Sequence, residues 1–153
     1  DIVDWQYRIP SGGHRPVTLV FAREKNEKAL KKALLNGQTV VWYNKKLIGK
    51  SDHLLPLINS SLKIESAHYI SATTIAHVVI SNNSDAPYTM RNQSEYDFYN
   101  ATNLITIPPH GSTIIDVRTL TKKRKFELQF EVLNALIKPD THPLFRIVVR
   151  PKQ

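Results

Sequence analysis

The second half of the chain alternates apolar and polar side chains with a period of two residues. Phe126, Leu128 and Phe130 point to one face and the glutamate and glutamine between them point to the other, which is the pattern of a half-buried antiparallel strand. Turn-forming residues interrupt the pattern at 82–85, 108–111 and 122–125. The predicted strands are residues 62–69, 75–81, 88–90, 96–98, 104–107, 112–117, 126–132 and 145–149. Short strands at this spacing predict an immunoglobulin-like antiparallel β-sandwich over residues 62–153.

The first 61 residues follow a different pattern. The apolar segment 17–21 predicts a strand, and the apolar residues within 29–34 recur at helical spacing, which predicts an amphipathic helix. Asn36-Gly37 should end that helix, because glycine adopts the left-handed conformation at little cost. Residues 39–43 are β-branched or aromatic and predict a second strand. The order is therefore strand, helix, strand.

A strand that returns through a helix ordinarily forms a parallel pair with a right-handed crossover. Parallel sheets are normally covered on both faces, which one helix cannot do. We therefore expect residues 1–61 to need neighbours from residues 62–153, from another chain or from a domain upstream of Asp1.

Residues 51–59, between the two halves, predict a short apolar helix that packs as their joint. Asp52 is expected to cap this helix, and Pro56 is expected in or near its first turn. The predicted fold class is α+β, with a βαβ piece over residues 1–61 and a sandwich over residues 62–153.

Composition narrows the classes of protein that fit. The chain has 153 residues, of which 41% are hydrophobic and 22% charged, so it can bury a core and is not disordered as a whole. Without cysteine it has no disulfide, thiolate nucleophile or cysteine-ligated metal. No apolar segment approaches the roughly 18 residues that a membrane-spanning helix requires. We therefore expect a folded domain protein without a membrane span.

The formal charge of +8 raises the question of a nucleic-acid partner. Residues 122–125, Lys-Lys-Arg-Lys, are the densest basic segment, but the remaining charge is spread along the chain. Trp42, Phe126 and Phe130 occupy strand positions that predict burial rather than an exposed stacking platform. We therefore do not expect nucleic acid to be the principal partner.

Candidate chemical groups are few. The histidines show no spacing typical of metal ligands, and His68 and His77 lie nine residues apart on predicted strands. His14 and Arg15 follow a glycine pair and precede the first strand, where a guanidinium could bind phosphate, although a salt bridge at a turn explains the same residues. The residues alone indicate no catalytic site and no metal site.

Several segments together resemble a known family. They are residues 14–22, 29–34, 37–43, 47–49, 54–62 and 130–137. These segments resemble the carboxyl-terminal region of PHP (polymerase and histidinol phosphatase) metallophosphoesterases, in the bacterial subgroup that carries an Ig-like domain after the catalytic barrel. The resemblance covers most of this chain but only the final part of a full-length member.

The resemblance implies that residues 1–61 are the last portion of a distorted β/α barrel and that residues 62–153 are the appended sandwich. In this family, divalent metals held by His, Asp and Glu activate a water that attacks a phosphoester. The metal motifs, including a late Asp-x-His, would precede Asp1, so divalent metals are implied for the full-length protein and no cofactor for this chain. His14 and Arg15 are carried over as substrate-phosphate contacts. Relatives of this type are often exported, which favours the periplasm or cell envelope.

We therefore expect the non-catalytic carboxyl-terminal portion of a metal-dependent phosphoesterase, inactive alone, whose partner is the N-terminal PHP barrel of the same polypeptide. The alternative is a stand-alone sandwich that binds glycan or nucleic acid through its loops and residues 122–125. A third possibility is an independent metalloenzyme that uses His68 and His77.

Overall fold

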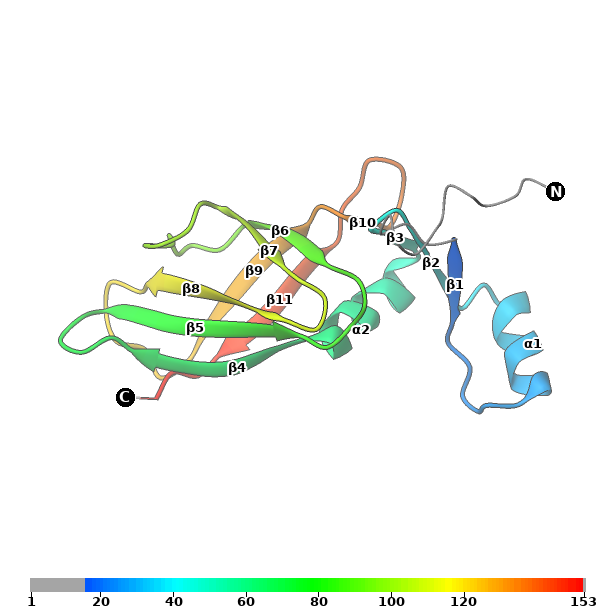
Figure 1. Ribbon diagram of the computed structural model, residues 1–153, viewed down its shortest axis with the longest axis horizontal. Coiled ribbons are helices and arrows are strands. Elements are labelled where there is room, and N and C mark those ends of the chain that lie inside the picture. The colour runs from blue at the N-terminus through cyan, green and yellow to red at the C-terminus, as the bar shows by residue number, and fades with distance from the viewer. Residues whose placement is uncertain (1–15, 153) are drawn as a thin grey trace.

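The computed structural model describes residues 16–152. Figure 1 shows a sandwich at one end of an elongated molecule, and a smaller sheet with α1 at the other. The helices are α1 (Glu27–Leu35) and α2 (Ser51–Ser61). The strands are β1 (Val17–Val20), β2 (Thr39–Tyr43), β3 (Lys46–Gly49), β4 (Leu62–Tyr69), β5 (Ile75–Asn82), β6 (Tyr88–Asn92), β7 (Leu104–Ile107), β8 (Ser112–Arg118), β9 (Phe126–Val132), β10 (Ala135–Leu136) and β11 (Leu144–Val149).

The sandwich is made of two antiparallel sheets. One has the order β11-β9-β6-β7 and the other the order β4-β5-β8. The side chains that alternate inward on β9 are at most 4% exposed, and they share one core with inward residues of the opposite sheet such as Val78 and Ile115. The period-two pattern thus marks the two inner faces correctly.

All but one of the predicted sandwich strands are confirmed, with small differences at their ends. The exception is the segment 96–98, which is not a strand. Phe98 forms only an isolated bridge with Val117, and the ring of Tyr96 packs edge-on against Phe126 with 5.2 Å between centroids. These aromatic residues lie in the connection between β6 and β7 and are buried there, while the backbone around Phe98 bonds to β8 through the Tyr99 and Arg118 amides without forming a strand.

The predicted parallel pairing of the first two strands is wrong. β1 pairs with β2 in antiparallel register, from Val17 opposite Trp42 to Val20 opposite Thr39. The backbone continues this pairing beyond the strands, because the Phe21 amide donates to the Gln38 carbonyl at 2.9 Å. Helix α1 buries only Ala33 and extends from the end of the hairpin. A helix that does not pack back across the sheet imposes no parallel crossover.

Two strands absent from the predicted set complete this sheet: β3 lies within residues 1–61, and only β10 comes from residues 62–153, as expected. The resulting sheet, which we call the junction sheet, has the order β1-β2-β3-β10. A two-residue turn at Asn44 and Lys45, with φ of 48° and 64°, connects β2 to β3 and is typical of a type I′ hairpin. β10 comes from the sandwich region and pairs with β3 in parallel, with Ala135 opposite Leu47.

Helix α2 is the predicted joint, but its start differs from the prediction. The N-cap is Lys50, which makes no side-chain cap, and Asp52 lies inside the first turn instead. Pro56 lies in the middle of the helix rather than in its first turn. Leu54 and Ile58 are fully buried, so the helix is held by packing at the joint more than by its capping.

Candidate functional site

The residues predicted from the sequence to contact substrate, His14 and Arg15, lie outside the described residues 16–152. Their role stays a prediction. Polar side chains form clusters at the junction sheet and the turns next to it, on the outer face of β4-β5-β8, and at the far end of the sandwich.

Asn134, directly before β10, ties the junction sheet to the sandwich. Its amide nitrogen donates to the carbonyl oxygens of Lys45 and Pro87 at 2.8 and 2.7 Å, and its Oδ1 accepts the backbone N–H of Thr89 at 3.0 Å. The Asn134 backbone carbonyl also accepts the Leu47 amide at 2.9 Å. One side chain therefore bonds the β2–β3 turn and the beginning of β6, which fixes the relative position of the two sheets.

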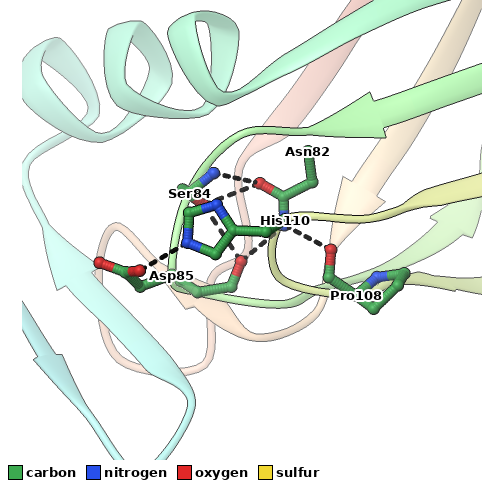
Figure 2. A network of polar contacts seen from close by, with 6 residues as sticks. Asn82, Ser84, Asp85, Pro108 and His110 are labelled. Carbon is green, nitrogen blue, oxygen red and sulfur yellow. Dashed lines mark hydrogen bonds and ion pairs between the residues drawn. The ribbon is translucent and has the colours of Figure 1, made fainter.

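A second polar cluster shapes the turn next to this junction (Figure 2). Asn82 is 2% exposed, and its amide nitrogen donates to the carbonyls of Ala86 and Pro108 at 2.8 and 3.0 Å. Its Oδ1 accepts both the backbone N–H and the hydroxyl of Ser84, at 2.9 and 2.8 Å. Buried amides are stable only when they are bonded in this way. The cluster therefore holds the β5–β6 turn against the β7–β8 turn.

His110 and Asp85 lie on the outside of the same cluster, with 2.6 Å between Nε2 and Oδ1 (Figure 2). Ser84 is close by, so the three residue types of a hydrolase triad are near one another. The geometry is not that of a nucleophile, because the Ser84 hydroxyl bonds to Asn82 Oδ1 and the Ala86 carbonyl rather than to the imidazole. The His110–Asp85 pair is exposed, as expected for a surface loop.

Tyr88, the first residue of β6, has a buried hydroxyl next to these turns. Burial raises the pKa of Tyr88, and the hydroxyls of Ser61 and Ser84 act in the opposite direction. The backbone carbonyl of Ser61 accepts the Asn83 amide at 2.9 Å, so the end of α2 is bonded to the same turn. The joint between the two regions is thus polar at its rim and apolar inside.

The junction sheet leaves one apolar face uncovered. Val40 and Leu47, on the side of α2, are at most 1% exposed. Their neighbours Val41 and Ile48 face the other way, lie opposite one another in the register and are 36% and 45% exposed. Leu136 on β10 continues this row. We call Val41, Ile48 and Leu136 the outer row.

Helix α1 is also largely uncovered. Leu30, Leu34 and Leu35 are 43%, 48% and 89% exposed. Three open surface hollows of about 850, 470 and 440 Å³ border this helix, lined mainly by charged and amide side chains such as Lys28, Lys32 and Asn26. Open hollows of this kind resemble a surface that contacts another domain more than they resemble a small-molecule pocket.

A polar row that spacing alone did not predict crosses the outer face of β4-β5-β8. His68 lies opposite His77, and His77 lies opposite Asp116. The His77 Nδ1 is 2.7 Å from Asp116 Oδ1, and the two imidazole centroids are 5.1 Å apart. The sequence did carry a signal for this row, because the inward positions of β5 place His77 on the outer face.

This row does not amount to a metal site. Within residues 16–152, no group of three or more His, Asp or Glu side chains is arranged to hold a metal ion. The described residues therefore do not fit the metal cluster of a PHP enzyme. Neither helix of the described chain has the length and apolar character needed to cross a bilayer.

The basic residues 122–125 lie between β8 and β9, where a turn was predicted. Lys123 donates to the Tyr96 hydroxyl at 2.8 Å and lies 3.6 Å from the carboxylate of Glu95. The hydrogen bond from Tyr96 and the charge of Lys123 lower the pKa of Glu95. Phe126 and Phe130 are buried and Trp42 is partly buried, so these three rings offer no exposed stacking surface.

Comparison with solved structures shows that the fold of this chain is similar to part of a larger protein. The chain is similar to a two-domain protein from Bacteroides vulgatus that is described as containing a predicted PHP-like metal-dependent phosphoesterase, with a TM-score of 0.79 and 24% sequence identity. The match covers 94% of this chain and 41% of that protein, so the chain spans less than half of its length. No curated protein matches the chain.

Comparison with family models gives the assignment. Residues 62–148 match the model DUF5001, described as an Ig-like domain, and this match begins at the first residue of β4 and ends within β11. The matched segment contains both sheets of the sandwich and β10. The chain belongs to this Ig-like domain family.

Proposed function

We propose that this chain is the non-catalytic carboxyl-terminal portion of a metal-dependent phosphoesterase of the PHP type. In this proposal residues 1–61 complete the catalytic domain, and residues 62–153 are an Ig-like accessory domain that supports it. The observation that carries the proposal is the uncovered outer row of a sheet that joins both regions.

The fold supports this assignment. Nearly the whole chain, junction sheet included, superposes on part of a two-domain protein whose description names a predicted PHP-like phosphoesterase. A domain boundary that cut the chain cleanly after residue 61 would separate β3 from β10, which pair with each other. An accessory domain that contributes a strand across its boundary is suited to hold a neighbouring domain firmly.

The exposed side chains support it as well. Val41 and Ile48 are apolar, lie side by side and are opposite to the face that α2 covers. Contiguous apolar surface of this kind is typical of a contact with another domain. We propose that the PHP barrel of the same polypeptide covers the outer row and α1.

The chemistry belongs to the barrel in this proposal. Residues 16–152 contain no group of side chains that could hold a divalent metal cluster, and in this proposal the metals are held by residues upstream of Asp1. His14 and Arg15 are proposed to approach the substrate phosphate from the barrel side, as the guanidinium geometry allows. No step of hydrolysis is assigned to residues 16–152.

The first test is the reading frame upstream of Asp1. We expect it to encode a PHP-type domain with an Asp-x-His motif. The product of that frame should hydrolyse p-nitrophenyl phosphate or its diester with Mn²⁺ and should lose activity with EDTA, while residues 1–153 alone should be inactive. An upstream frame without such a domain, or chelator-sensitive turnover by residues 1–153 alone, contradicts the proposal.

The second test concerns the contact. Ile48→Lys should lower the melting temperature of the full product and leave that of residues 1–153 nearly unchanged. Ile114→Lys is the matched control, because Ile114 is 48% exposed and lies on β8, which belongs to the β4-β5-β8 sheet and not to the junction sheet. If both variants have the same effect in the full product, the outer row is not the contact.

A further inference from the structure

The far end of the sandwich carries a concentrated positive charge. Residues 118–125, which we call the basic loop, contain Arg118, Lys122, Lys123, Arg124 and Lys125 and no carboxylate. Figure 1 shows the loop between β8 and β9 at the end of the molecule opposite α1, beside the β4–β5 loop and near the C-terminus. The basic loop is therefore remote from the surface proposed for the barrel.

The basic loop is hydrogen-bonded to the end of β4 and to the β4–β5 loop. The Tyr69 hydroxyl accepts the Lys123 amide at 2.7 Å and lies 3.2 Å from the Lys123 carbonyl, to which it donates. Thr119, which is 1% exposed, donates its amide and hydroxyl to the Thr74 carbonyl at 3.1 and 2.8 Å. A binding surface that is ordered in advance loses less entropy when it binds.

Most of the cations on this loop are available to a partner. Lys123 interacts with Glu95 and lies over the Tyr96 ring at 4.8 Å, so its charge is partly neutralised. Lys122, Arg124 and Lys125 are exposed, and no carboxylate within residues 16–152 forms an ion pair with any of them. The Lys122 ammonium lies 5.7 Å from the centre of the Tyr69 ring.

An apolar side chain projects from the same loop. Leu120 is 86% exposed and has a φ of 59°, a left-handed conformation that is unfavourable for leucine. Ile70, at the beginning of the adjacent β4–β5 loop, is 37% exposed. An exposed leucine in an unfavourable backbone conformation, next to unpaired cations, indicates a surface that becomes covered.

We propose that the basic loop binds an anionic phospholipid surface, with Leu120 entering the apolar boundary and Lys122, Arg124 and Lys125 facing the headgroups. Apolar insertion combined with cations is the usual basis of peripheral binding to anionic membranes. A single-stranded nucleic acid fits less well, since it requires exposed rings for stacking. The exposed ring at this end, Tyr99, has the Arg118 guanidinium over its face at 4.9 Å.

The test is co-sedimentation of residues 1–153 with vesicles of phosphatidylcholine alone or with 30% phosphatidylglycerol, at roughly 0.1 M salt. We expect binding to the anionic vesicles, weakened by added salt. Replacing Lys122, Arg124 and Lys125 together by Ser should lower the partition coefficient about 100-fold, on the order of fivefold for each charge. The matched control replaces Lys28, Lys31 and Lys32 of α1 by Ser.

Apolar insertion is tested separately from charge. Leu120→Asn keeps a residue that tolerates positive φ and should lower the partition coefficient roughly tenfold, as expected for an apolar side chain that loses its contact with the bilayer. Leu35→Asn on α1 is the control, because Leu35 is 89% exposed. Melting temperatures of all variants establish that they are folded.

Three results would overturn the proposal. The first is equal partition into the two kinds of vesicle, and the second is an effect of Leu120→Asn no larger than that of Leu35→Asn. The third is binding to a single-stranded oligonucleotide that exceeds vesicle binding and depends on Lys122, Arg124 and Lys125, which identifies a polyanion as the partner. None of these results bears on the proposed phosphoesterase parent, because the basic loop lies at the end of the sandwich away from β2, β3 and β10, which carry the outer row (Figure 1).

Discussion

Removing the Asn134 side chain is the sharpest test of how the two regions are joined. Asn134→Ala eliminates three hydrogen bonds, to the carbonyls of Lys45 and Pro87 and from the amide of Thr89. Each bond contributes about 0.5–1.5 kcal/mol net. The bond to Lys45 is exposed to water, so its share is at the lower end. We therefore expect the free energy of unfolding to fall by about 2–3 kcal/mol.

The assay is urea unfolding followed by circular dichroism, together with native-state hydrogen exchange. The control is Asn83→Ala, since Asn83 is exposed and its side chain makes no hydrogen bond within residues 16–152. Hydrogen exchange should show a larger loss of protection for the Leu47 amide, which bonds to the Asn134 carbonyl, than for the Leu128 amide in the sandwich. If Asn134→Ala costs no more than Asn83→Ala, or if Leu47 and Leu128 lose protection equally, Asn134 does not join the two sheets.

Three further predictions concern stability. Ile58→Ala removes a fully buried side chain at the joint and should lower the free energy of unfolding in urea by about 2–5 kcal/mol. The control is Leu57→Ala, which truncates a partly buried neighbour. A smaller loss for Ile58→Ala than for Leu57→Ala contradicts the packing described. Gly37→Ala places a Cβ at a φ of 64° and should cost about 1–2 kcal/mol by thermal unfolding, whereas an unchanged melting temperature would show that α1 ends differently. The pKa of Tyr88 is raised by burial, so its contribution to stability is fully present below pH 10 and is lost as the pH rises through the raised pKa. As the pH rises above 10, the free energy of unfolding of Tyr88→Phe should therefore fall less than that of the unsubstituted protein. Parallel pH profiles for the two proteins would refute this.

The sandwich could be predicted from the sequence because its information is local. On β9, every second side chain is buried, and that alternation is visible in the order of the residues. The turn residues around Asn82 and His110 also marked the strand ends correctly. The pattern was wrong at segment 96–98, which was predicted as a strand but lies in the connection between β6 and β7 and forms an isolated bridge to β8.

The polar sites were less predictable, because each one joins positions that are distant in the chain. Asn134 bonds to Lys45 across 89 residues, and Asp116 meets His77 across 39 residues. Neither contact can be predicted from the spacing of residues along the sequence, because both depend on the order of the strands in the sheets. The basic loop was visible as a cluster of charge, but the exposure of Leu120 and the bonds of Tyr69 that hold the loop were not.

The sequence by itself determined where the chain pairs as strands in its second half and where α1 ends. Tertiary structure decided which strands become neighbours. β1 and β2 are antiparallel because α1 extends from the hairpin end instead of crossing the sheet. β3 gains β10 as its partner because Asn134 and α2 bring the sandwich against it. Pairing between distant segments depends on the whole packed core, and a local pattern carries no information about it.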